Sequence, residues 1–181
     1  MLSIFIITGL LIIFFSMFRK KAKEITKHTL PLDNQKTIFQ LINIIGENNE
    51  VASNMVSIGG TPSRQWLSFN LLLHLCDVDD FITMTESTIG SIRVYGCFGL
   101  ICNNHVDLNI IKKKLLSDYS WVNTFDTCIK GRSTVARCIK DANQWIDYES
   151  TRKFIQNISS DNRRRNRLIE DLVNEKFIHL Y

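Results

Sequence analysis

The N-terminal stretch Met1–Phe18 (MLSIFIITGLLIIFFSMF) most restricts what this chain can fold into. It contains no ionisable side chain. As a helix it would extend about 27 Å at 1.5 Å per residue, slightly less than the roughly 30 Å of a bilayer's hydrocarbon core. We therefore expect a membrane segment, most simply a transmembrane helix.

A secretory signal peptide is the main alternative for this stretch. Such a peptide carries positive charge before a shorter apolar region and small residues at a cleavage site after it. Here no Lys or Arg precedes the apolar run, and Met17–Lys20 stands where the cleavage site would be. These departures favour a segment that is retained. Translation from Met17 in place of Met1 would delete it, so both starts stay open.

Four basic residues follow the apolar run, namely Arg19, Lys20, Lys21 and Lys23. Positive residues remain on the cytosolic side of an inserted helix. Near an anionic leaflet each also contributes about 1 kcal/mol of attraction. We therefore predict that the body lies on the cytosolic side of a membrane and that an anionic inner leaflet is its partner.

Hydrophobic spacing predicts several helices in the body. Apolar residues recur at helical spacing in 33–45 and in 106–116, and again from Asp141 onward. The stretch 66–81 is apolar on nearly every side and too long for a strand, so it is expected to be one buried helix. Its acidic residues Asp77, Asp79 and Asp80 are expected to mark the helix end.

Other stretches favour strands. Residues 51–58 form a moderate strand pattern closed by Gly and Pro, and 92–102 is the strongest strand pattern. Because 92–102 carries apolar residues on both faces, it is expected to be a central strand covered by helices. Two short alternating runs, 125–129 and 134–139, predict a hairpin around 130–133.

Length and pattern together predict the domain organisation. A chain of 181 residues suits one domain with appendages. We expect a membrane segment at 1–18, a basic linker at 19–32 and a single α+β domain at 33–181. In that domain a small antiparallel sheet would be covered by helices.

A metal site is considered at Cys97-x4-Cys102-x2-His105, with His74-x-Cys76 upstream. Zinc needs four ligands that converge on one point. On a strand the thiols at 97 and 102 would face opposite sides, and on a helix residues 74 and 76 would diverge by roughly 200°. The sequence therefore favours buried reduced cysteines, which fit an odd total of five in a cytosolic body. We predict no metal and no cofactor.

A cysteine nucleophile is the remaining catalytic hypothesis. It would pair Cys97 or Cys102 with His105 or His74, and Asp77 would orient the base. No known nucleophile turn surrounds either cysteine. We therefore expect that the protein is not an enzyme and keep a Cys/His enzyme as the less favoured alternative.

Positive charge is the more informative signal, since the formal net charge is +4. The candidate sites for an anionic partner are Lys112, Lys113, Lys114, Arg163, Arg164, Arg165 and Arg167. Lipid headgroups and nucleic-acid phosphates both suit such clusters. Another basic group comprises Lys130, Arg132, Arg137 and Lys140. For this group and for 112–114, solvated faces remain an equal alternative. For the arginines at 163–167 we favour a bound anionic partner, because four arginines so close together repel one another.

The order of parts between Val51 and Leu108 resembles the core of rhabdovirus matrix proteins. A strand ends in a Gly/Pro/Arg turn at 56–64 (VSIGGTPSR), a helix with an aromatic start follows, and 89–102 (IGSIRVYGCFGLIC) completes the order. The opening Met-Phe-Arg-Lys-Lys at Met17 also resembles the start of that family. The chain departs from the family in lacking a Pro-Pro-x-Tyr motif and in its apolar N-terminus.

This resemblance implies a structural protein that self-associates and links viral ribonucleoprotein to the inner face of the envelope. The residues alone indicate part of this, namely a membrane-proximal, basic, cytosolic body without a catalytic constellation. Together with the resemblance they predict a membrane-associated structural or adaptor protein. A viral origin would place it in the virion and at the host cell membrane, with a nucleoprotein as partner and homo-oligomers expected. The alternative is a membrane-anchored accessory protein that binds nucleic acid.

Overall fold

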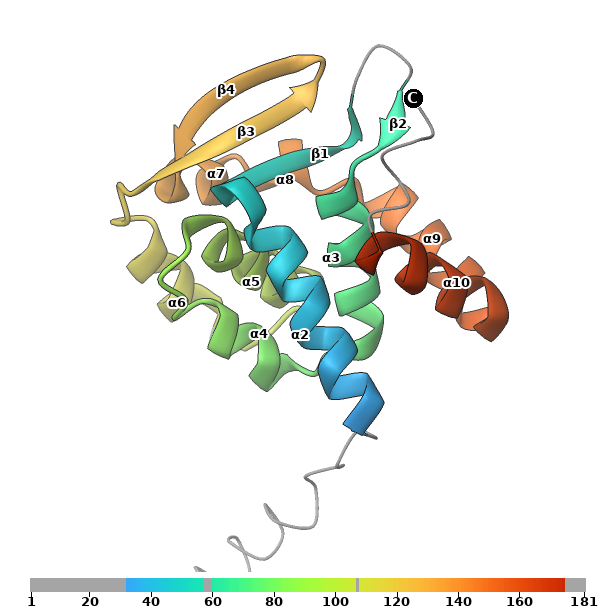
Figure 1. The fold of residues 1–181 in the computed structure, drawn as a ribbon. Coiled ribbons are helices and arrows are strands. Elements are labelled where there is room, and N and C mark those ends of the chain that lie inside the picture. Colours follow the sequence, from blue (N-terminus) through green and yellow to red (C-terminus); the bar gives the residue numbers. More distant parts are fainter. Residues whose placement is uncertain (1–31, 57–59, 107, 175–181) are drawn as a thin grey trace, which may run out of the picture. The chain divides into compact units, whose positions relative to one another are not determined.

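The computed structural model describes residues 32–56, 60–106 and 108–174. The chain divides into two compact units, Met1–Gln35 and Lys36–Tyr181. The predicted membrane segment and nearly all of the predicted basic linker lie outside the described residues. The second unit contains the sheet and helices α3 to α10, and it is α+β as predicted (Figure 1).

Helix α5 (Gly90–Cys102) is the centre of this unit. Its side chains are buried on nearly all sides, and Val94, Cys97 and Leu100 are fully inaccessible. The predicted strand at 92–102 is therefore wrong. A fully buried helix and a fully buried strand both show apolar residues all round, so periodicity does not separate them.

Two glycines let α4 (Val78–Met84) lie directly against α5. A Cβ atom at Gly99 would be 2.1 Å from the Phe81 ring, and one at Gly96 would be 2.9 Å from the Thr85 backbone nitrogen. Neither position accepts a larger side chain unless the Phe81 ring or the backbone at the end of α4 is displaced. These glycines allow close helix packing, which also explains why Gly is tolerated inside a helix here.

The predicted helix 66–81 is divided in two. Helix α3 (Arg64–Leu75) ends before Cys76, and α4 begins after Asp77. Asp77 accepts a hydrogen bond from the backbone N–H of Asp80, while the Asp80 carboxylate accepts one from the N–H of Asp77. This reciprocal capping box starts a helix. The acidic residues therefore begin α4 and do not mark the end of one long helix.

The sheet has four strands in the order β2-β1-β3-β4. They are β1 (Glu50–Val56), β2 (Thr61–Pro62), β3 (Trp121–Thr127) and β4 (Ile129–Thr134). The β1–β3 pair is parallel, whereas the other two pairs are antiparallel. The sheet is therefore mixed, and the prediction of an antiparallel sheet is wrong. Between β1 and β3 the chain passes through four helices, and parallel pairing requires a long crossover of this kind.

The predicted hairpin exists, but it is shifted along the chain. Strand β3 begins at Trp121, and the connection to β4 is made by residues 127–128, between the paired Asp126 and Ile129, with Thr127 at a φ of +50°. Residues 130–133 are part of β4 and do not form the turn. The predicted second strand at 134–139 is helix α7 (Val135–Lys140), whose N-cap Thr134 accepts a hydrogen bond from the N–H of Arg137.

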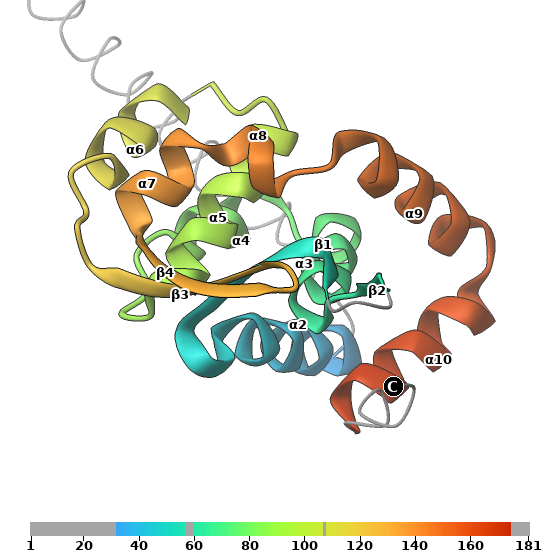
Figure 2. The same ribbon diagram turned by 90° about the horizontal axis from the view of Figure 1, so that it is seen from above.

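The remaining helical predictions are confirmed. They correspond to α2 (Leu32–Gly46), α6 (Leu108–Leu115), α8 (Ala142–Trp145), α9 (Tyr148–Ser160) and α10 (Asn162–Val173). A short 3₁₀ turn, η1 (Glu47–Asn49), joins α2 to β1. Helices α5 and α7 lie on one side of the β3–β4 hairpin (Figure 2).

Helix α5 is joined to the sheet by one buried hydroxyl group. The Tyr95 hydroxyl oxygen accepts a hydrogen bond from the backbone N–H of Ala52, at 3.0 Å. Its ring lies among Phe69 and Phe98, with ring centroids 5.3 and 5.9 Å away. Burial raises the pKa of Tyr95, so the phenol stays protonated.

Candidate functional site

Helix α6 and its flanking residues present apolar and basic side chains together. We define the α6 surface as Val106, Ile110, Lys113, Lys114, Leu116 and Tyr119, all of them exposed. The side chains of Val106, Ile110 and Tyr119 are 87%, 71% and 74% exposed. Such large exposed apolar side chains are characteristic of an interaction surface when they lie close together.

Helical geometry brings several members of the α6 surface together. Ile110, Lys113 and Leu116 follow one another at three-residue spacing, which places them on one face. The backbone N–H of Leu116 donates to the carbonyl oxygen of Lys112 at 2.9 Å, so the helical spacing continues to Leu116. The face combines aliphatic groups with ammonium groups.

The three predicted lysines of α6 differ in environment. Lys112 is half-buried, and its charge acts on the thiol of Cys97 in α5. Lys114 forms an exposed ion pair with Glu86 at 2.8 Å, whereas Lys113 is exposed and makes no ion pair within the described part of the chain. Only Lys113 and Lys114 are therefore placed to meet an external partner.

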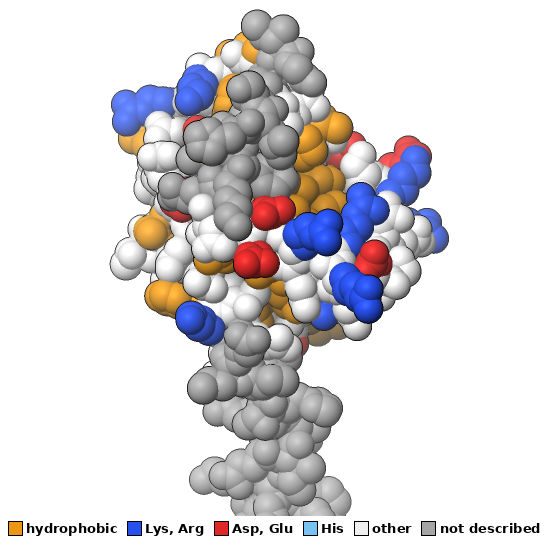
Figure 3. All heavy atoms as spheres, turned by 45° about the vertical axis from the view of Figure 1, so that its right-hand side comes forward, with side chains coloured by type: hydrophobic (Ala, Val, Ile, Leu, Met, Phe, Trp, Pro, Cys, Tyr) orange, Lys and Arg blue, Asp and Glu red, His pale blue; other side chains and the backbone are white. Residues whose placement is uncertain are grey.

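The arginines of α10 also divide into two groups. Arg165 turns inward, and its Nη1 lies 3.2 Å from Nε2 of His74 on α3. Arg163, Arg164 and Arg167 are exposed and have no carboxylate within ion-pair distance among the residues that the structure describes. Figure 3 shows Lys and Arg side chains gathered on the side of the molecule where α9 and α10 lie.

His74 connects three helices through its ring nitrogens. An arginine only donates, so Nε2 must accept from Arg165, and the proton of the neutral ring lies on Nδ1. Nδ1 then donates to Oγ of Ser159 on α9, at 3.4 Å. This arrangement makes His74 a structural contact and not a base for Ser159. Burial, together with the nearby Arg165 charge, lowers the pKa of His74.

The lowered pKa of His74 predicts a loss of stability in mild acid. The unfolded chain, with a histidine pKa of about 6.5, binds this proton more readily than the folded chain. The contribution of His74 to stability is therefore fully present above about pH 6.5, the unfolded pKa, and it is lost as the pH falls through the pKa of the folded state. We expect the thermal unfolding temperature to fall less between pH 7.5 and 5.5 in His74→Gln than in the unchanged chain. Equal falls in the two proteins would contradict the role of His74.

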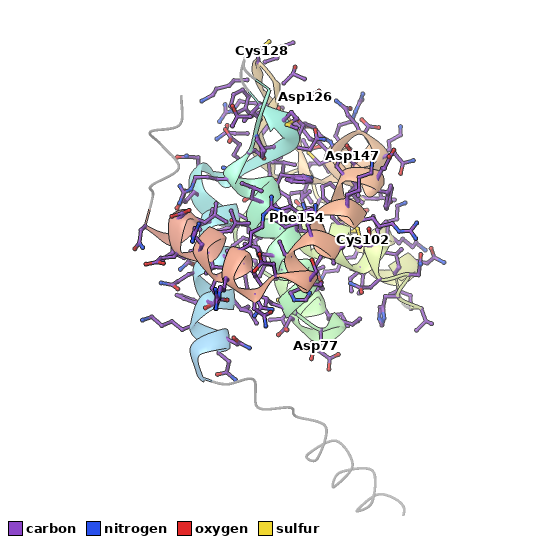
Figure 4. All side chains as sticks on the ribbon, turned by 90° about the vertical axis from the view of Figure 1, so that its right-hand side faces the viewer. Asp77, Cys102, Asp126, Cys128, Asp147 and Phe154 are labelled. Carbon is purple, nitrogen blue, oxygen red and sulfur yellow. The ribbon has the colours of Figure 1, made fainter. Side chains whose placement is uncertain are left out.

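The cysteines do not converge on a site. Cys97 and Cys138 are buried, Cys76 and Cys102 are half-buried, and Cys128 is exposed. Figure 4 places Cys128 and Asp126 at the hairpin tip, far from both Cys102 and Asp77. Within the described ranges no three His, Cys, Asp or Glu residues are grouped so that they could hold a metal ion. The argument that opposite strand faces separate Cys97 from Cys102 is wrong, since both belong to helix α5.

The sequence analysis missed one group of side chains. By placing 130–133 in a turn, it separated Lys130 and Arg132 from Trp121 and Phe125. The register of β3 and β4 puts all four on one face of the hairpin. The alternation of Trp121, Asn123 and Phe125 with smaller residues is the signal that indicates a strand face at these positions.

The basic residues Arg19, Lys20, Lys21 and Lys23 lie outside the described residues, as does the apolar run before them. Among the helices that the structure does describe, none is both long enough and apolar enough to cross a bilayer. Comparisons of the chain with protein-family models, with curated proteins and with solved structures find no match.

Proposed function

We propose that this chain is a non-enzymatic structural or adaptor protein that acts at the cytosolic face of a membrane. The α6 surface is the observation that carries the proposal. Exposed aliphatic side chains on the same helix as lysines suit the boundary between lipid headgroups and acyl chains, because the apolar groups enter and the ammonium groups remain at the phosphates. The N-terminal apolar segment would hold the chain near that boundary.

The state of the cysteines supports a non-enzymatic role. Burial raises the pKa of Cys97 to about 12 and that of Cys102 and Cys138 to about 11. These thiols are protonated at neutral pH, whereas the thiolate is the nucleophilic form. His74, one of the two histidines considered as the base, is held by Arg165 and Ser159.

The resemblance to rhabdovirus matrix proteins supplies a more specific form of the proposal. In that form the protein self-associates below the envelope and attaches the viral ribonucleoprotein to it. The outer arginines of α10, namely Arg163, Arg164 and Arg167, would then contact the acidic partner. Their side chains are exposed and free of internal carboxylates in the described structure.

Vesicle flotation tests the α6 surface separately from the N-terminal segment. Because Lys36–Tyr181 is a unit of its own, a chain lacking residues 1–18 should keep its folded body. We expect the full chain to float with vesicles containing phosphatidylserine and to resist alkaline carbonate. The shortened chain should float at low salt and be released by salt, since surface charge attraction is screened. Ile110→Asp in the shortened chain should weaken flotation by about tenfold, which corresponds to about 1.4 kcal/mol of lost interaction.

A matched control uses an isoleucine elsewhere on the surface. Ile129 in β4 is 69% exposed, close to the 71% of Ile110. Ile129→Asp introduces the same charge and should leave vesicle binding unchanged. Equal losses in the two variants would reject the α6 surface as the lipid contact. If the full chain is extracted by carbonate and the shortened chain does not float, the membrane role itself fails.

A further inference from the structure

The β3–β4 hairpin carries aromatic and basic side chains on one face. In its antiparallel register Phe125 lies opposite Lys130, and Asn123 lies opposite Arg132. Residues directly opposite one another point to the same side of a sheet, and Trp121 belongs to this side by alternation. We call Trp121, Phe125, Lys130 and Arg132 the hairpin face.

The hairpin face points away from the core. On the opposite side of β3, Val122 is buried, and its Cγ1 would lie 2.7 Å from a Cβ atom at Gly90 of α5. On the hairpin face Lys130 and Arg132 are exposed, and the Trp121 side chain is 62% exposed. A large aromatic ring is thus presented to solvent on the same face as two cations, and an exposed ring of this kind is typical of an interaction surface.

The backbone beneath this face is held firmly. Strand β3 pairs with β1 on one side and β4 on the other. In addition, Nδ2 of Asn49 donates to the carbonyl oxygen of Trp121 at 2.8 Å, and Nδ2 of Asn123 donates to that of Asn48 at 2.6 Å. The side chains of the hairpin face therefore project from a fixed platform, which reduces the ordering cost of binding.

Aromatic rings and cations already interact on this platform. Nζ of Lys130 lies over the Phe125 ring, 5.0 Å from its centroid. One face of the Phe125 ring is therefore occupied, whereas the Trp121 ring remains open to solvent. Lys130 and Arg132 are two residues apart on β4, or about 7 Å along the strand. Glu50 on β1 interacts electrostatically with Lys130, which leaves the two cations in excess of the one carboxylate.

We propose that the hairpin face binds single-stranded nucleic acid, with a base stacked on Trp121 and the phosphates beside Lys130 and Arg132. Proteins that bind single strands combine a cationic track with exposed aromatic rings in this way. The bases of a single strand are free to stack, whereas those of a duplex are already stacked on each other. The inference does not depend on the α6 surface, which lies on different residues.

The chemistry of the hairpin face favours this ligand over a lipid surface. Asn123 stands between its two aromatic residues, and its amide is engaged with the backbone. The side chains of the hairpin face are thus aromatic, basic or amide. The face lacks the aliphatic groups that enter a bilayer, in contrast to Val106, Ile110 and Leu116 of the α6 surface. Arg152 and Lys153 on α9 are exposed and carry the same two charges outside both proposed surfaces, so they serve as a charge-matched control.

Fluorescence anisotropy of the full chain in neutral detergent tests the proposal. The probes are labelled oligouridylate and oligothymidylate of about 12 nucleotides and a duplex of the same length. We expect the single strands to bind more tightly than the duplex, with affinity that falls steeply as salt is raised. Comparison of the two single strands identifies RNA or DNA as the ligand. Lys130→Glu with Arg132→Glu should weaken binding at least tenfold, and Trp121→Ala should weaken it roughly tenfold.

Tryptophan fluorescence gives a direct measure of stacking. The chain has three tryptophans, and Trp66 and Trp145 are buried, with 7% and 9% exposure. Oligonucleotide should therefore quench mainly Trp121. Trp121→Phe should keep most of the binding and lose the quenching, which separates stacking from a structural role of this residue.

The charge-matched control is Arg152→Glu with Lys153→Glu on α9, two exposed residues outside both proposed surfaces. We expect it to change oligonucleotide affinity less than threefold, and circular dichroism should show all variants folded. An equal loss in the two double variants would overturn the hairpin site in favour of a general charge effect. Absence of quenching, or equal affinity for the duplex, would overturn it as well. Loss of vesicle flotation in the hairpin variants without loss of oligonucleotide binding would assign this face to lipid instead.

Discussion

Replacing Phe98 by alanine is expected to lower the free energy of unfolding by about 3–5 kcal/mol, the usual cost of removing a buried aromatic ring. Phe98 is 1% exposed in the middle of α5. Its ring centroid lies 5.9 Å from that of Tyr95 and 6.4 Å from that of Phe69, with both pairs edge to face. Removal leaves a cavity that the neighbouring rings cannot fill, because α3 and α5 are already packed against each other. Urea titration of the chain lacking residues 1–18, followed by circular dichroism, measures the loss.

Phe39 provides the matched control for this change. It has the same side chain on α2, but it is 64% exposed. Phe39→Ala should alter stability by no more than about 0.5 kcal/mol, as is usual for surface positions. Comparable losses at the two positions would show that α5 is not the buried centre of the body.

Replacing Gly99 by alanine is expected to destabilise the protein by about 3 kcal/mol, at the upper end of the usual cost of overpacking. The added Cβ would lie 2.1 Å from Cδ1 and 2.4 Å from Cε1 of the Phe81 ring. Phe81 is completely buried, so the ring cannot turn aside, and α4 must move away from α5. The same urea titration measures this change.

Two further variants make the Gly99 prediction specific. Gly131→Ala adds a methyl group in β4, where the closest atom is Oγ1 of Thr124 at 3.1 Å, and it should change stability little. Phe81→Leu removes part of the clashing ring, so combining it with Gly99→Ala should cost less than the sum of the two single changes. Such non-additivity is expected only for residues in contact. Strict additivity would argue against the close approach of α4 and α5.

Sequence patterns predicted the amphipathic helices well, because one face of each meets the core and the other meets water. Residues 33–45 and 106–116 show apolar residues at this helical spacing, and both form helices at nearly the expected positions. The pattern failed at 92–102, where Ile92, Val94 and Tyr95 favour a strand locally. There the surrounding helices and β1 bury every side, and the intrinsic preference is overridden.

The candidate sites were predicted less completely than the helices. Local sequence identified the lysine and arginine clusters, but not that Lys112 and Arg165 turn toward the body. It also could not indicate that Lys130 and Arg132 lie beside aromatic rings, because that depends on the register between two strands. A shift of one residue moves every side chain to the other face of a strand.

The sequence by itself determined the apolar N-terminal run, the basic character, the α+β class and most helix positions. These properties depend on composition and on spacing within a few residues. Only the tertiary structure decided that α5 is a central helix, that β1 and β3 are parallel, and which charged groups remain free for a partner. Those outcomes depend on contacts between distant residues, such as Gly99 with Phe81 and Tyr95 with Ala52. Local spacing carries no information about such contacts.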